Sequence, residues 1–257
     1  MAPIISAREL HKTFDGLQVL KGASLDVEEG EAMAVVGQSG DGKTVFLKHL
    51  AGLMQPDSGQ VFVNGKDLCC LRGRELRELR SRLGYVFQGG ALFQSMTVFE
   101  NVAFPLREKT SLDDEAIRER VELSLSRVGL TGAEKKYPAE ISGGMVKRVA
   151  LARLLVRRAD VMFLDEPTTG LDPIIVHEIH DLVESLREKL SITAVIVTHE
   201  IPNIFPIVDR VAMLHEGRIR YVGTPTEILH CEDKVVHRFI EESMPPERFR
   251  IARETMS

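Results

Sequence analysis

The chain has 257 residues, of which 44% are apolar and 28% charged, an ordinary composition for a globular protein that buries a substantial core. Its formal net charge of −5 argues against a dedicated nucleic-acid-binding protein, because such proteins usually carry a basic domain. Three cysteines, two of them adjacent at Cys69 and Cys70, form no disulfide framework and favour a reducing compartment.

The sequence predicts no membrane segment. The N-terminus, Met-Ala-Pro-Ile-Ile, lacks the basic and apolar regions of a signal peptide, so we expect none. No apolar run reaches the roughly 18 residues that a membrane helix needs. A role at a membrane would therefore require a partner that spans it.

The first part of the chain is predicted to contain short strands. Ile4–Leu10 and Val19–Val27 flank a turn at Asp15–Gly16. The apolar run Ala32–Val36 then breaks into a glycine-rich loop and a helical pattern over Val45–Leu53. A strand, a glycine-rich loop and a helix in this order are the setting in which a phosphate-binding loop occurs.

The middle of the chain changes character. After a short strand at Gln60–Val63, the pattern is helical without a clear strand from about Gly89 to Ala159. Strand character returns at Val161–Leu164, and Asp172 then caps a helix that begins at Pro173.

The last part alternates again. Ile192–Thr198 is predicted to be a buried strand, and Arg210–Val222 a hairpin that turns at Glu216–Gly217. Strands, then helices, then alternating strands and helices predict an α/β core with an inserted helical arm.

The segment Gly37–Thr44 fits the phosphate-binding pattern G-x-x-x-x-G-K-[S/T]. Backbone N–H groups would converge on the phosphates, Lys43 would reach the β- and γ-phosphates, and the Thr44 hydroxyl would bind Mg²⁺. The alternative is a glycine-rich turn without a ligand. Asp41 is unusual so close to phosphate, and we expect its carboxylate to point outward. The expected ATP-binding residues in this segment are Gly37, Gln38, Ser39, Gly40, Asp41, Gly42, Lys43, Thr44 and Val45.

An apolar strand that ends in two acids follows at Val161–Glu166. Asp165 at the end of the strand could hold Mg²⁺, usually through water, and Glu166 could polarise an attacking water molecule. Taken without the phosphate-binding loop, the same residues could be two solvated acids.

A second anion site is predicted at Ile141–Met145, which begins a helix that runs to about Arg158. Ser142 caps this helix, and two glycines leave its positive N-terminus bare. One chain hardly needs two such sites for one nucleotide unless the second faces another copy. The alternative is an ordinary serine cap followed by flexible glycines.

These motifs, in this order, resemble the ATPase subunits of ABC transporters, and the similarity covers about residues 4–228. The resemblance implies a P-loop NTPase (RecA-like) core with an N-terminal antiparallel β-subdomain and an inserted α-helical subdomain. The core would comprise residues 1–88 and 160–228, the helical subdomain residues 89–159, and a C-terminal extension residues 229–257. A short helix around Val236, Phe239 and Ile240 or a loosely ordered terminus could form this extension.

The resemblance also implies roles for single residues. Phe14 would stack on adenine, Gln88 would contact Mg²⁺ and the attacking water, and His199 would contact the γ-phosphate; without the resemblance, Phe14 and His199 could be structural. The implied ATP contacts from the opposite subunit are Ser142, Gly143 and Gly144. The implied catalytic residues are Glu166, His199, Gln88 and Lys43, and the implied Mg²⁺ ligands are Thr44, Gln88 and Asp165.

A narrower resemblance points to the cargo. Met145 in place of the more usual glutamine, together with the loop over residues 88–108, is similar to the ATPases of lipid-asymmetry (Mla, MCE-type) transporters. This implies an ATP- and Mg²⁺-dependent homodimer at the cytoplasmic face of the inner membrane. Its partners would be a membrane permease, which inserts its coupling helix at residues 88–108, and an MCE-domain protein, with no nucleic acid. The alternatives are an ABC transporter for another cargo, a soluble ABC ATPase, and a nucleotide-binding module that does not hydrolyse ATP.

Overall fold

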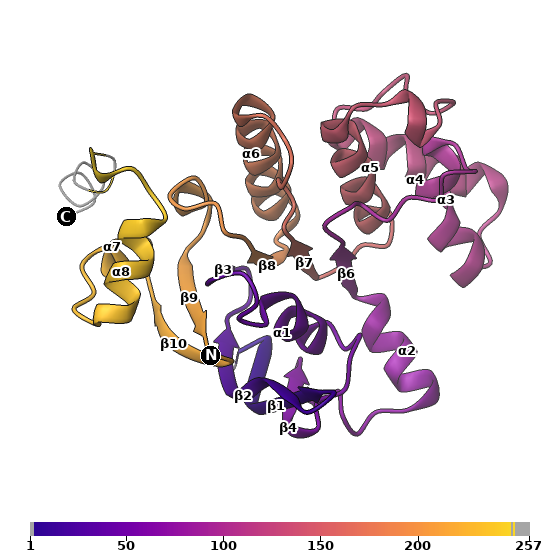
Figure 1. Cartoon of the computed structure of the whole chain (residues 1–257). Helices are drawn as coiled ribbons and strands as arrows, with labels where there is room; N and C mark the ends of the chain where they lie inside the picture. Colours follow the sequence, from indigo (N-terminus) through magenta and orange to yellow (C-terminus); the bar gives the residue numbers. More distant parts are fainter. Residues whose placement is uncertain (1–2, 248, 250–257) are drawn as a thin grey trace. The chain divides into compact units, whose positions relative to one another are not determined.

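The computed structural model describes residues 3–247 and 249, which form two compact units (Figure 1). The first unit consists of the described residues of Met1–Arg80 and Thr193–Ser257, and the second consists of Ser81–Ile192. The sequence-based division, with a helical subdomain over residues 89–159, has other limits and stays a prediction.

An antiparallel sheet opens the first unit, with strand order β2-β1-β4-β5. The turn at Asp15–Gly16 is confirmed, since both residues have positive φ, 48° and 83°. The first strand runs on to Phe14, beyond its predicted end at Leu10. A bulge at Glu9 and further register shifts after Leu10 interrupt the alternation of buried and exposed residues, so the sequence pattern does not show the end of the strand. The strands are β1 (Ile5–Phe14), β2 (Leu17–Val27), β4 (Ser58–Val63) and β5 (Lys66–Asp67).

A second, mixed sheet in the first unit has strand order β10-β9-β3-β8. The central strand β3 (Ala32–Val36) is buried throughout and lies parallel to β8 (Thr193–Val197) and β9 (Arg210–His215). Strand β10 (Arg218–Gly223) returns antiparallel to β9 and confirms the predicted hairpin. The continuous apolar runs of these strands are typical of parallel strands that are covered on both faces.

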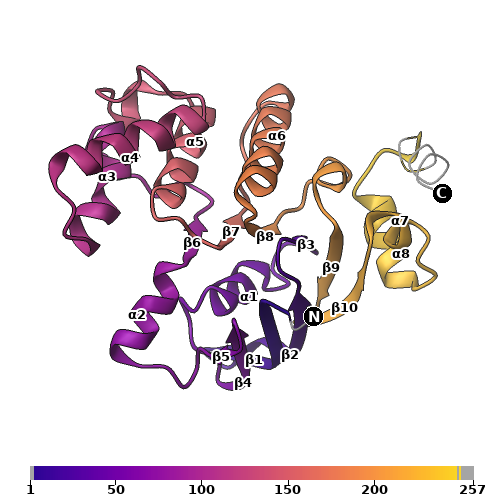
Figure 2. The ribbon, with the colours of Figure 1, turned by 180° about the vertical axis from the view of Figure 1, so that it is seen from behind.

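Helices flank these sheets within the first unit. Helix α1 (Lys43–Leu50) contacts β8 and β2, and α7 (Pro225–Leu229) packs beside β10, next to α8 (Lys234–Glu242) (Figures 1 and 2). Val236, Phe239 and Ile240 form the buried face of α8, as predicted. Residues 248 and 250–257 of the expected C-terminal extension lie outside the described part of the chain.

Helix α2 (Gly73–Ser81) was not predicted from the sequence. Its residues are mostly arginine and glutamate, and its apolar side chains are only Leu76 and Leu79, of which Leu79 is buried, so the apolar stripe is too short to indicate a helix. Arg80 near its end donates a hydrogen bond to the carbonyl of Gly52.

The second unit pairs β6 (Leu83–Val86) in parallel with β7 (Val161–Asp165) and adds helices. The helices are α3 (Val98–Lys109), α4 (Asp114–Arg127), α5 (Gly143–Leu155) and α6 (Pro173–Leu190). Asp113 caps α4, Ser142 caps α5 and Asp172 caps α6, and each side chain accepts a hydrogen bond from a backbone N–H of the first turn of its helix. No strand lies between residues 89 and 159, as predicted.

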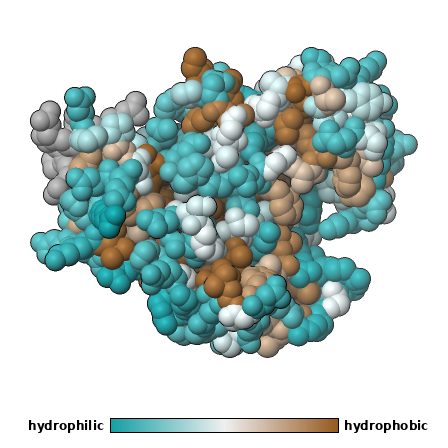
Figure 3. Space-filling model, viewed as in Figure 1, coloured by the Kyte–Doolittle hydropathy of each residue, from teal (hydrophilic) through white to brown (hydrophobic). Residues whose placement is uncertain are grey.

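Most large apolar side chains are buried, and the exposed ones among the described residues include Phe14, Phe87 and Phe93. On the face seen in Figure 3, hydrophilic side chains predominate and apolar ones gather in separate patches. In the described part of the chain, no helix is both long enough and apolar enough to span a bilayer.

Asn101 organises the segment that leads into α3. Its side chain is fully buried and accepts a bond from the Phe93 N–H at 2.8 Å. The same amide donates to the carbonyls of Phe93, Met96 and Thr97 at 3.0, 3.1 and 3.0 Å. The Phe93 and Thr97 carbonyls also accept from the N–H groups of Met96 and Asn101, so the Asn101 side chain is the partner chiefly of the Phe93 N–H and the Met96 carbonyl.

We predict that Asn101→Ala lowers the free energy of unfolding by about 2 kcal/mol, because the variant removes a fully buried amide and takes its hydrogen bonds from the Phe93 N–H and the Met96 carbonyl. Urea denaturation of the full chain measures the loss. Gln94→Ala, a change at an exposed position of the same segment, is the control and should cost less than about 0.5 kcal/mol. Equal stability of the two variants would contradict the assigned role of Asn101.

Candidate nucleotide site

The loop between β3 and α1 has the shape of an anion cradle. Glycine is required at two of its positions: a Cβ on Gly37 would overlap the Leu214 carbonyl, and one on Gly42 would lie 2.8 Å from Val19 Cγ1. Helix α1 begins directly after Gly42 with no side-chain cap and no acid in its first turn. Its N-terminal N–H groups are therefore not capped by a side chain, and they carry the partial positive charge of the helix end.

Lys43 lies against this loop. Its side chain is buried, and its ammonium donates to the carbonyls of Gly37 at 2.8 Å and Gln38 at 2.9 Å. A buried ammonium next to uncapped N–H groups makes the loop strongly favourable for an anion such as a phosphate chain.

Asp41 does not point outward, contrary to the sequence-based expectation. Its side chain is 12% exposed, and its carboxylate accepts bonds from the N–H groups of Gln38 at 2.9 Å and Glu216 at 3.1 Å. The carboxylate turns toward the protein because backbone N–H groups of the loop and of the β9–β10 turn lie close enough to donate to both of its oxygens.

The other predicted residues of the first unit lie at the ends of strands near the loop. The parallel pairing of β3 and β8 places their C-terminal ends together, so His199 and Gly37 leave the sheet at one edge. Phe14 lies at the tip of the β1–β2 hairpin, whose second strand carries Val19. Phe14 is 40% exposed and His199 is exposed, so neither is a core residue.

Phe14 has a cation beside its ring. The Lys12 ammonium lies 5.4 Å from the ring centroid and is held by Asp57 at 2.7 Å. The hydrogen bond from Lys12 and one from the Thr13 N–H lower the pKa of the Asp57 carboxyl. The end of β1 is thus fixed next to an exposed aromatic ring.

In the second unit, β7 ends in the two predicted acids. Asp165 is 4% exposed, so it is not a solvated acid, and its carboxylate accepts a bond from the Tyr85 hydroxyl at 2.9 Å. Burial and the Asp165 charge raise the pKa of Tyr85, which keeps the phenol a donor at neutral pH. Glu166 follows with a positive φ of 50°, and its carboxylate accepts a bond from the Thr169 hydroxyl at 3.0 Å.

The start of α5 has the predicted Ser142 cap followed by two glycines. Ser142 accepts a bond from the Met145 N–H at 3.3 Å, and the first turn carries no acid. Gly144 is required by packing, because a Cβ there would lie 2.7 Å from Ile175 Cγ2, whereas Ser142 and Gly143 are exposed. The helix end therefore presents an open serine–glycine surface with a partial positive charge.

Two cations of α5 were missed by the sequence analysis. The buried Lys147 donates to the carbonyls of Gln88 and, at 3.4 Å, Glu166. Arg153 donates to the carbonyls of Gly90 and Ala91, both at 2.8 Å. These contacts belong to no sequence motif. The available signal was Lys147, a lysine on a helix face that apolar residues usually occupy.

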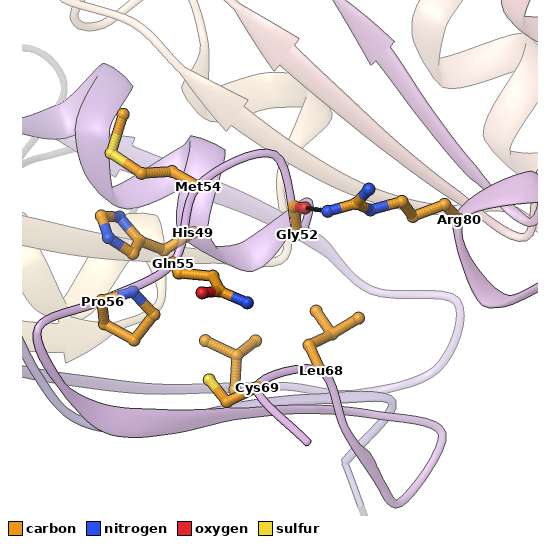
Figure 4. Close-up of a pocket in the computed structure, with 9 residues that line it drawn as sticks. His49, Gly52, Met54, Gln55, Pro56, Leu68, Cys69 and Arg80 are labelled. Atoms are coloured by element: carbon orange, nitrogen blue, oxygen red, sulfur yellow. Dashed lines mark hydrogen bonds between the residues drawn. The ribbon is translucent and has the colours of Figure 1, made fainter. Parts of the chain in front are cut away.

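A small pocket of the first unit is separate from these residues. It is lined by side chains that include His49, Met54, Cys69 and Arg80, and no predicted site residue lines it (Figure 4). Within the described residues, no group of three or more His, Cys, Asp or Glu side chains could hold a metal ion. The three cysteines are free.

Comparison with known proteins identifies the relatives of the chain. A family model described as ABC transporter matches residues 20–169. The intermembrane phospholipid transport system ATP-binding protein MlaF of Haemophilus influenzae is 40% identical over 228 residues, covering 88% of this chain and 86% of that protein. The probable ribonucleotide transport ATP-binding protein mkl of Mycobacterium leprae is 38% identical over 240 residues, covering 93% and 69%.

A solved structure shows the same fold. It is a dimeric post-hydrolysis state of an ATP-binding cassette bound to ADP and Pi, with 29% identity, a TM-score of 0.79, and coverage of 86% of this chain and 98% of that one. The predicted fold class, an antiparallel β-subdomain with a RecA-like mixed sheet and helices, is confirmed. Since the family model covers more than half of the chain, the chain belongs to the ABC transporter family, as an ATP-binding subunit that hydrolyses ATP.

Proposed function

We propose that this chain hydrolyses ATP to drive phospholipid transport between bacterial membranes. The observation that carries the cargo assignment is the similarity to MlaF along nearly the whole chain. Met145 and the loop over residues 88–108 support the same assignment by their resemblance to lipid-asymmetry transporters. The identity to mkl is nearly as high, so ribonucleotide transport is the competing function.

In the proposed reaction, the loop over Gly37–Thr44 and the start of α1 bind the phosphates, and adenine stacks on Phe14. Glu166 polarises the attacking water, and its bond from Thr169 orients the carboxylate. Lys43 and His199 offset the negative charge that develops on the γ-phosphate. Each of these groups lies at or next to the end of a strand or the start of a helix, and that element determines its position.

Mg²⁺ fits the oxygen groups that these motifs supply. Thr44 offers a hydroxyl, Gln88 an amide and Asp165 a carboxylate oriented by Tyr85, and these are the oxygen ligands that Mg²⁺ prefers, alongside nucleotide phosphates. The ion would neutralise charge on the phosphates.

Two copies are proposed to close head to tail on two ATP molecules. The loop before α1 and the start of α5 would provide two anion sites on one chain, and a two-fold dimer would let each nucleotide use one site from each copy. The dimeric state of the solved relative supports this arrangement. In it, Ser142, Gly143 and Gly144 cover the nucleotide of the opposite copy.

The proposed partners are a membrane permease and an MCE-domain protein, with the chain bound peripherally at the cytoplasmic face of the inner membrane. The exposed Phe87 and Phe93 next to Gln88 offer an apolar surface for a permease segment. The similarity to an intermembrane phospholipid transport subunit supports these partners.

We predict that Glu166→Gln lowers the rate of ATP hydrolysis by at least about 100-fold, because the amide cannot act as a base toward water. Binding of ADP should change less than about threefold, since the P-loop is untouched. Phosphate release and calorimetry measure the two quantities. Glu188→Gln, at an exposed position of α6, is the control and should keep full activity. A Glu166→Gln variant that turns over like the unmodified protein would refute the catalytic role.

The trans arrangement predicts complementation. Ser142→Glu places a carboxylate at the proposed phosphate-binding start of α5, so it should abolish activity, as should Glu166→Gln. Mixed dimers of these two variants retain one intact site, and a one-to-one mixture should recover about a quarter of the unmodified activity by random pairing. ATP turnover of the mixture measures this recovery.

The doubly substituted chain, Ser142→Glu with Glu166→Gln, is the matched control. When it is mixed with the unmodified chain, both sites of the mixed dimer are defective if the α5 start acts on the opposite copy, and one site remains active if it acts within its own chain. Residual activity from such mixed dimers would exclude the head-to-tail arrangement.

The cargo assignment predicts phospholipid movement by the complex isolated with its membrane partner. In proteoliposomes, ATP should drive transfer of a fluorescent phospholipid to acceptor vesicles, and Glu166→Gln should stop it. A labelled ribonucleotide, tested in the same vesicles, should not be taken up or released. ATP-dependent ribonucleotide movement without lipid transfer would replace the phospholipid assignment.

A further inference from the structure

We propose that Asp41 is a positioning residue that latches the phosphate-binding loop to the β9–β10 turn and thereby holds the loop in its binding conformation. The proposal rests on the proposed role of the loop in binding phosphates. It explains why an acid occupies a loop that is built to attract anions.

The first half of the latch closes within the loop. Asp41 Oδ2 accepts from the Gln38 N–H at 2.9 Å, and the Asp41 N–H donates to the Gln38 carbonyl at 3.2 Å. The two residues therefore bind each other reciprocally, which fixes the loop between them. It also engages the Gln38 N–H, so the phosphate cradle is left to the other amides of the loop.

The second half reaches a turn that is itself fixed. Asp41 Oδ1 accepts from the Glu216 N–H at 3.1 Å. The Lys21 N–H donates to the Gly217 carbonyl at 2.9 Å, and Gly217 packs so tightly on Val19 that a Cβ would overlap the Val19 carbonyl. Because β2 holds the turn, the Glu216 N–H is an anchor that does not move with the loop.

The latch also stabilises and orients a negative charge that would otherwise oppose binding. A free carboxylate in this loop would repel a phosphate chain, since the two anions would be a few ångströms apart. Here both carboxylate oxygens accept from backbone donors, and the side chain is largely buried. His215 Nδ1 lies 3.9 Å from Oδ2, beyond hydrogen-bond distance.

Lys43 and Asp41 hold the loop through different groups. Lys43 donates to the carbonyls of Gly37 and Gln38. Asp41 uses N–H groups of Gln38 and Glu216, so its bonds do not depend on Lys43. The latch therefore holds the loop independently of Lys43.

The test is nucleotide binding and turnover by Asp41→Ala in the full chain. Because Asp41 shapes the loop and does not itself contact the reacting phosphate, the Kd for ADP and the KM for ATP should both rise about tenfold, with kcat within about twofold. Amide hydrogen exchange at Gln38 and Glu216 should accelerate together in the variant. Asp41→Asn offers one acceptor oxygen instead of two, so its Kd should fall between those of the unmodified chain and Asp41→Ala.

Glu216→Asn is the matched control. It keeps the backbone N–H that Asp41 uses, tolerates the positive φ of 47° at this position, and changes only an exposed side chain, so its Kd for ADP should stay within about twofold. If the unmodified chain fails to bind ADP, the role of the loop is refuted. If it binds but both Asp41 variants bind ADP as tightly, only the latch is refuted. A fall in kcat at unchanged KM would also overturn it, because Asp41 would then act on the reacting phosphate.

Discussion

The uncapped N–H groups at the start of α1 are the feature on which the first unit depends. They arise because β3 ends in a loop too tight for side chains, where Gly37 passes under the Leu214 carbonyl and Gly42 lies against Val19. A longer or bulkier loop would move the helix away from the sheet edge and lose the alignment of its dipole with the predicted phosphates. The parallel neighbours of β3 deliver His199 to the same edge, so one packing constraint places several site residues.

In the second unit, the organising feature is a set of side-chain hydrogen bonds rather than a helix start without a side-chain cap. There, Lys147 and Arg153 of α5 donate hydrogen bonds to the carbonyls that follow β6, and the Tyr85 hydroxyl of β6 donates to the Asp165 carboxylate. Such bonds are strong because a buried charge without partners would be costly. The loop that carries Gln88 is therefore attached to the same helix whose bare end is proposed to meet the second nucleotide. Any movement of α5 must carry this loop with it.

Asp41 combines both features, because it lies in the loop before α1 and its carboxylate is held by hydrogen-bond donors. It is an acid within an anion site, and it is tolerated because two backbone donors use both of its oxygens. The cost of burying a carboxylate is offset only when such donors are already in place. The stability of the β9–β10 turn thus becomes part of nucleotide binding, although no residue of that turn belongs to a recognisable motif.

The sequence alone determined the family, the fold class and the place of the glycine-rich loop between β3 and α1, because these follow from local patterns: glycine spacing, apolar periodicity and capping residues. It also placed the turns at Asp15–Gly16 and Glu216–Gly217 and the caps at Ser142 and Asp172. It missed α2, whose apolar stripe consists of only two leucines, and the end of β1, which lies beyond a bulge. Only the tertiary structure decided where Asp41 points, which carbonyls Lys147 and Arg153 hold, and why Gly144 must be glycine. Those outcomes depend on groups distant in the sequence that packing brings within hydrogen-bond or van der Waals distance, and no local pattern records such proximity.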